Sequence, residues 1–130
     1  MLRLIGHLHP VLVHLPIGTL TVGLILFWKN RLTGKQTNSQ LAFIFLVSGI
    51  TALVSCITGY VLAVNGDEYA SLVWSHRNAA ILLTILTFIC WWLLARDQQP
   101  QLQKILTVFL AVMLLVPETL TPATLFSLAA

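Results

Sequence analysis

The chain has 130 residues, of which 58% are hydrophobic and only 8% are charged, and its mean hydropathy is +0.90. An average soluble domain has roughly 25% charged residues, so this composition argues against a soluble globular protein. The formal net charge of +3 comes from a few unevenly placed residues, and it gives no reason to expect a nucleic-acid partner.

Four apolar segments, residues 9–28, 41–63, 72–95 and 105–127, are each long enough to cross a membrane as a helix. The hydrocarbon core requires about 20 apolar residues in helical conformation. The connections between the segments are short, so we expect residues 1–130 to form a single domain. The predicted fold class is an all-α integral membrane protein, a bundle of four antiparallel transmembrane helices.

Basic residues predict the orientation of this bundle. The first and third connections carry Lys29, Arg31, Lys35, Arg96 and Lys104, whereas the other side carries Arg3, Arg77, Asp67 and Glu68. Lys and Arg are enriched in cytoplasmic loops, so both termini should face outward. We therefore expect a multi-pass protein of the bacterial inner membrane, with the lipid bilayer as a partner and homo- or hetero-oligomers left open.

The first segment opens with GHLHPVLVHLPIG, which holds His7, His9, His14, Pro10 and Pro16. An ionisable side chain at membrane depth is costly unless it is partnered, so this run marks a candidate functional site. Pro10 suits the first turn of a helix, where its missing N–H costs nothing. Pro16 lies further in and removes the donor for the Leu12 carbonyl, which predicts a bend beside His14.

Other polar residues fall on the same predicted side of the membrane. His76 and Arg77 lie near the outer end of the third segment, and Glu118 lies near the outer end of the fourth. With about 1.5 Å of rise per helical residue, His14 and His76 should lie at similar depth. All four histidines are therefore expected in the outer leaflet.

Small residues form a stripe on the second segment. Gly49, Ala52, Cys56 and Gly59 are spaced by three, four and three residues, which places them on one helical face. Such a stripe permits the close approach of another helix or of a flat cofactor, and both interpretations stay open. Cys56 and Cys90 are expected at different depths, too far apart for a disulfide, so both are interpreted as packing residues.

The run HPVLVHLPIG resembles the opening motif of a bacterial membrane family catalogued as domain of unknown function 2231. The pattern His-Pro-x-x-Val-His-x-Pro-Ile matches His9, Pro10, Val13, His14, Pro16 and Ile17. A Thr-Gly pair ending at Gly59 and the later His76 also fit. The resemblance implies about four spans but no activity. The final segment, PETLTPATLFSLAA, departs from the glycine-rich, often histidine-bearing end expected of this family.

The chemistry that suits these histidines best is haem b held by two imidazoles from different helices of a bundle. His14 and His76 are the predicted axial ligands, with His9 near the edge of the site. Arg77 would face a propionate, and Gly59 would leave room for the ring. The predicted function is an electron carrier that exchanges electrons with quinol or a cytochrome near the outer surface.

Two alternatives remain open at this stage. His7, His14, His76 and Glu118 could instead ligate a transition metal such as Zn, Cu or Fe. The histidines could also form a buried hydrogen-bond network in a non-catalytic membrane subunit or partner-binding domain. The sequence offers no nucleophile–base–acid set for hydrolysis and no C-x-x-C-H motif for covalent haem attachment, so an enzymatic role beyond redox chemistry is not predicted.

Overall fold

In the computed structural model, the described residues are 9–34, 38–64, 70–97 and 99–115, and within them the chain forms helices and turns but no strand. A short helix, α2 (His9–Leu12), is followed by four longer ones: α3 (His14–Thr33), α4 (Asn38–Val64), α5 (Ala70–Ala95) and α6 (Pro100–Leu115). The predicted all-helical class is confirmed. The fourth apolar segment extends beyond residue 115, so its end lies outside the described residues.

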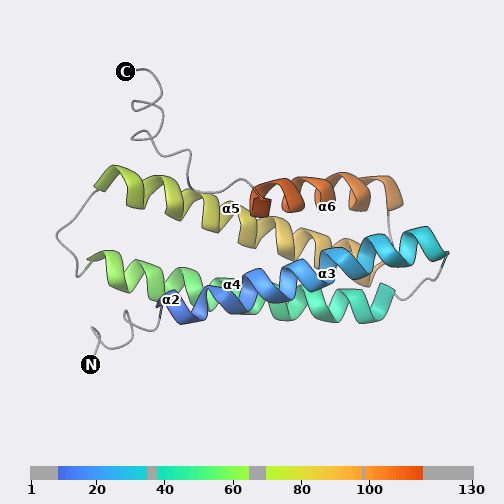
Figure 1. Ribbon diagram of the computed structural model, residues 1–130, viewed down its shortest axis with the longest axis horizontal. Coiled ribbons are helices and arrows are strands. Elements are labelled where there is room, and N and C mark those ends of the chain that lie inside the picture. Colours follow the sequence, from blue (N-terminus) through green and yellow to red (C-terminus); the bar gives the residue numbers. More distant parts are fainter. Residues whose placement is uncertain (1–8, 35–37, 65–69, 98, 116–130) are drawn as a thin grey trace, which may run out of the picture.

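The long helices run antiparallel to their successors along the chain (Figure 1). Helix α4 packs against α3 and α5, and α6 packs against α5 and α3. Within the described ranges, α3 is not a direct neighbour of α5, and α4 is not a direct neighbour of α6. The four helices therefore form a ring in which α3 and α5 lie on a diagonal.

The helix ends follow from local sequence. Helix α3 ends at Thr33 and is capped by Gly34, whose φ of 68° is left-handed and whose N–H donates to the Asn30 carbonyl. Glycine adopts this conformation without the steric cost of a Cβ atom. Helix α6 begins at Pro100, where a missing N–H costs nothing. Between α5 and α6, the Asp97 carboxylate accepts a hydrogen bond from the Asn38 side chain, which ties this turn to the start of α4.

The cluster of buried apolar residues lies in the half of the bundle where all four long helices overlap. Figure 1 shows that the described part of α6 runs beside this half and ends near the middle of the molecule. The buried apolar cluster consists of Leu20, Leu24, Phe27, Leu41, Ala42, Phe45, Cys90, Leu94 and Leu110. Every long helix contributes to it, so this half holds the ring of helices together.

Within the part of the chain that the structure describes, two stretches are long and apolar enough to cross a membrane: Asn38–Val61 in α4 and His76–Ala95 in α5. Only 44% and 28% of their apolar windows are buried inside the bundle. Helix α6, as far as it is described, is apolar but shorter. These helices make membrane association plausible, while insertion and orientation remain predictions.

The small-residue stripe of α4 contacts α5 at two of its members. A Cβ atom at Gly49 would lie 3.0 Å from two ring atoms of Phe88. Further along, the Cys56 thiol lies 3.5 Å from the Thr84 hydroxyl. At these positions the stripe serves helix packing, and no cofactor is needed to explain it. Cys56 and Cys90 are both free thiols, as predicted.

Replacing Gly49 by Leu should destabilise the bundle by about 1–3 kcal/mol, because the new side chain overpacks the Phe88 ring. Gly18→Leu is the matched control, since nothing lies within 4 Å of a Cβ atom at Gly18. Both changes gain the same helix propensity, so their difference isolates packing. Thermal unfolding in detergent measures it, and equal midpoints for the two variants would contradict the α4–α5 contact.

Candidate functional site

The first helical segment is interrupted beside His14, as its prolines predict. Helix α2 ends at Leu12 and α3 begins at His14, with Val13 between them. Pro16 has no N–H to donate to the Leu12 carbonyl, and the next bond, from the Ile17 N–H to the Val13 carbonyl, is long at 3.4 Å. The helical hydrogen bonding is therefore interrupted beside His14, as the proline predicts, while Val13 keeps helical φ and ψ angles of −66° and −24°. The predicted bend stays a prediction.

Hydroxyl side chains bond to carbonyls in the first turn of α3. The Ser48 hydroxyl of α4 is buried and donates to the Pro16 carbonyl at 3.2 Å. The Thr19 hydroxyl lies 3.2 Å from the same oxygen and 2.8 Å from the Leu15 carbonyl. These bonds do not replace the donor that the Leu12 carbonyl loses to Pro16. The Ser48 bond ties the first turn of α3, which begins at His14, to α4.

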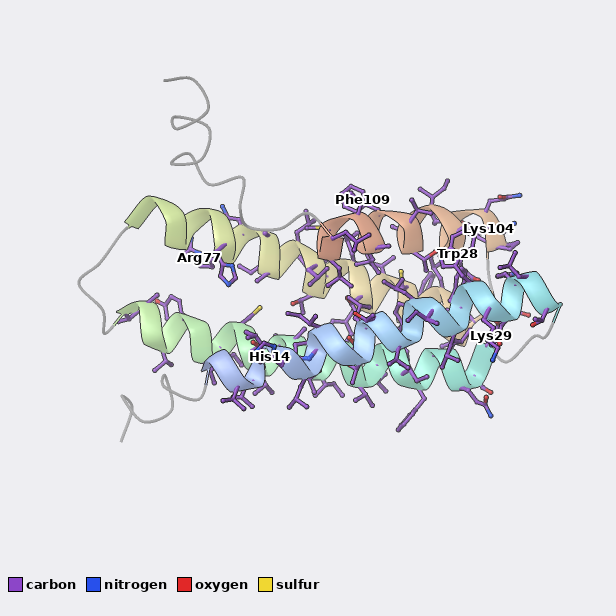
Figure 2. All side chains as sticks on the ribbon, viewed as in Figure 1. His14, Trp28, Lys29, Arg77, Lys104 and Phe109 are labelled. Carbon is purple, nitrogen blue, oxygen red and sulfur yellow. The ribbon has the colours of Figure 1, made fainter. Side chains whose placement is uncertain are left out.

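The two predicted axial ligands lie on the diagonal helices. His14 is the first residue of α3 and is exposed. His76 lies in the second turn of α5 and is also exposed, and the adjacent Arg77 is half-buried. Figure 2 shows His14 and Arg77 in the same half of the bundle, opposite the half that holds Lys29 and Lys104. The two residues share one half of the bundle, but the predicted match in depth between His14 and His76 is not reproduced. Pro16 is level with Ser48, and the next residue, Gly49, meets Phe88, so His14 lies about ten residues of α5, on the order of 10–15 Å, from the level of His76.

The structure does not test the positions of the other predicted ligands. His7 and Glu118 lie outside the described residues, and His9 belongs to α2 with its side chain undescribed. Among the described residues, no group of three or more His, Cys, Asp or Glu side chains is placed to hold a metal ion. Gly59 is half-buried near the C-terminal end of α4. The metal site and the haem site both remain predictions.

The opposite end of the bundle contains a buried polar node that the sequence interpretation missed. The Arg31 guanidinium of α3 donates to the Gln103 side-chain oxygen at 2.6 Å, and the Gln103 amide nitrogen donates to the Leu93 carbonyl at 3.2 Å. Gln103 is only 1% exposed. This single amide therefore connects α3, α5 and α6.

Gln103 supplies a hydrogen-bond donor to the C-terminal end of α5. The last four carbonyls of a helix lack intrahelical donors. Here the Trp92 and Leu94 carbonyls accept from the backbone N–H groups of Arg96 and Asp97. The Leu93 carbonyl accepts from the Gln103 side chain instead. A polar residue at this position is thus required by the backbone of a neighbouring helix.

A signal for this node was present in the sequence. The buried face of α6 consists of Gln103, Thr107 and Leu110, spaced by four and three residues. Such spacing places Gln103 on the same helical face as two residues that an apolar helix would bury. An amide on that face predicts a buried hydrogen-bonding role, but its partners depend on how the helices are arranged.

No family model, curated protein or solved structure matches the chain. The likeness to domain of unknown function 2231 therefore remains a prediction from the motif around His14.

Replacing Gln103 by Leu should destabilise the bundle by about 1–3 kcal/mol, because the buried Leu93 carbonyl loses its side-chain donor. Gln101→Leu, on an exposed position of the same helix, is the matched control. Denaturation in mixed micelles compares the two variants with the wild type. If Gln103→Leu proved as stable as Gln101→Leu, the node would have no structural role.

Proposed function

We propose that the chain is a multi-pass protein of the bacterial inner membrane whose long helices lie in lipid. The observation that carries this proposal is the distribution of polarity between the inside and the outside of the bundle. Buried polar residues are Ser48, Ser55, Thr58, Thr84, Thr87, Gln103 and Thr107. Exposed apolar stripes include Ile50, Leu53, Val54 and Ile57 on α4, Ile81, Ile85 and Ile89 on α5, and Ile105, Val108, Phe109 and Val112 on α6.

This distribution suits a lipid environment better than water. A soluble monomer rarely exposes contiguous apolar patches larger than a few hundred Å². In membrane bundles, by contrast, lipid covers the apolar side chains and small or hydroxyl residues line the helix contacts. The buried threonines Thr84 and Thr87 bond within their own helix, to the Ala80 carbonyl at 2.8 Å and the Leu83 carbonyl at 2.7 Å. The buried Ser48 hydroxyl bonds across to the Pro16 carbonyl of α3. These hydroxyls therefore fill the interior with their donors satisfied.

Sided labelling tests this placement and its orientation. Single cysteines at Lys35, Asp67 and Gln101, in a background without Cys56 and Cys90, should react differently with a membrane-impermeant maleimide. In intact spheroplasts we expect labelling at position 67 alone, and in inverted vesicles at positions 35 and 101, because basic loops stay in the cytoplasm. Labelling of positions 35 and 101 from opposite sides would contradict the four-span arrangement.

We infer further that the half of the bundle containing His14 binds haem b and carries electrons near the outer face. Directly packed helices have axes about 8–10 Å apart, and helices on a diagonal are more widely separated. A haem with two axial imidazoles needs such a separation between the helices that supply its ligands. His14 on α3 and His76 on α5 come from two helices that do not contact each other directly, and both side chains are exposed, which supports this choice of ligands. Because the two residues lie at different levels of the bundle, binding between them would require a shift of the first segment along α5.

Neighbouring residues fit the same group. Arg77 follows His76 and is half-buried in the same half of the bundle as His14 (Figure 2), and its guanidinium is of the type that pairs with a propionate. Gly59 lies near the end of α4, the helix that packs against both α3 and α5. When bound, haem would supply one-electron chemistry, and these residues would hold and orient it.

Absorption spectroscopy of protein expressed with ample haem and purified in detergent tests this function. The wild type should show a Soret band and a low-spin reduced spectrum, and His14→Ala or His76→Ala should abolish the low-spin signal because both nitrogens are required. Arg77→Ala should retain the spectrum but lose haem more readily. Asn78→Ala, an exposed position two residues from His76, is the control and should behave as wild type.

A wild-type protein without Soret absorbance would overturn the haem proposal. It would leave the function of a non-catalytic membrane subunit, in which the same alanine variants change only stability. Metal analysis of the same sample tests the third interpretation, a transition-metal site. In that case, replacing His7 or Glu118 should reduce the metal content as much as replacing His76.

A further inference from the structure

Basic side chains gather at the end of the bundle opposite His14. Lys29 and Arg31 belong to the last turns of α3, Arg96 follows α5, and Lys104 lies in α6. Figure 2 shows Lys29 and Lys104 at this end together with Trp28. Among the described residues, the acidic side chain at this end is that of Asp97, which accepts a hydrogen bond from Asn38 of α4. This end therefore carries a net positive charge.

Arg31 is held in a fixed position on the seam between α3 and α6. Its Cζ atom lies 5.3 Å from the centre of the Phe27 ring, and one of its terminal nitrogens donates to Gln103. A guanidinium has five N–H donors, and the uncharged amide of Gln103 uses one of them without cancelling the charge. The remaining donors stay available for a second, anionic acceptor.

Lys104 adds a second cation at the level of the Arg31–Gln103 bond. It directly follows Gln103 in α6 and is half-buried. Because Gln103 is bonded to Arg31, the seam places the two cations on neighbouring helices at the same level of the bundle. Trp28, half-buried on α3, is of the residue type that collects at the lipid headgroup level.

We propose that this α3–α6 seam binds the phosphate of an anionic phospholipid, such as phosphatidylglycerol, in the cytoplasmic leaflet. Arg31 supplies a planar fork of donors that matches phosphate geometry, and Lys104 supplies a point charge. Basic pockets between helices on the cytoplasmic side suit anionic headgroups in this way. The inference rests on the membrane placement proposed above, but it is independent of haem binding at the opposite end.

Native mass spectrometry of the detergent-solubilised full chain, with equimolar phosphatidylglycerol and phosphatidylcholine, tests the proposal. The wild type should retain phosphatidylglycerol preferentially, and Lys104→Gln should reduce that retention about fivefold while leaving the Arg31–Gln103 bond in place. Arg96→Gln is the charge-matched control, since Arg96 belongs to neither α3 nor α6 and its guanidinium lies over the Trp92 ring of α5, 4.9 Å from the ring centre. It should retain the lipid as the wild type does.

Three results would overturn the lipid site. Equal retention of the two lipids would show that no headgroup is selected, and equal losses in Lys104→Gln and Arg96→Gln would show general charge attraction. Displacement by millimolar inorganic phosphate would identify a site for the free anion. Thermal unfolding of Lys104→Gln checks that the variant is folded. The sided labelling described above reports separately on membrane placement, so the two proposals fail in different measurements.

Discussion

The central constraint on this fold is that polar groups must be satisfied inside a bundle whose outer surface is apolar. Thr87 and Thr84 meet it by bonding to carbonyls one turn earlier in their own helix. Ser48 and Gln103 meet it across helices, at the Pro16 and Leu93 carbonyls. An unsatisfied polar group costs several kcal/mol in an apolar setting, so these bonds determine which faces can be buried.

The two cross-helix bonds lie at places where a helix backbone is incomplete. Pro16 distorts the start of α3, and the end of α5 leaves the Leu93 carbonyl without an intrahelical donor. At the end of α5, Gln103 supplies the missing donor. At the start of α3, Pro16 deprives the Leu12 carbonyl of its donor, and Ser48 bonds instead to the Pro16 carbonyl in the following turn. Ser48 joins α4 to the helix that carries His14, and Gln103 joins α6 to Arg31 and to the end of α5. A cross-helix bond therefore lies beside the chemistry proposed for each half of the bundle.

Much of the fold could be predicted from the sequence because its signals are local. Apolar segment length predicts the helices, and Pro16 predicts the break beside His14. The small-residue spacing predicts the face on which Gly49 meets Phe88. The order of the helices around the ring could not be predicted in this way, since loop length and hydropathy do not specify which pairs lie on a diagonal. The partners of Gln103 depend on that order, and so does the separation of His14 from His76.

The diagonal arrangement also gives the small residues of α4 two different roles. Helix α4 is a direct neighbour of both α3 and α5, so any group that bridges His14 and His76 must lie beside it. Gly49 is not available for such a group, because the Phe88 ring already fills the space next to it. Gly59 lies ten residues further along, near the helix end. The proposed haem therefore requires an open face at Gly59, whereas simple helix packing would require only that Gly59 meet α5 as Gly49 does.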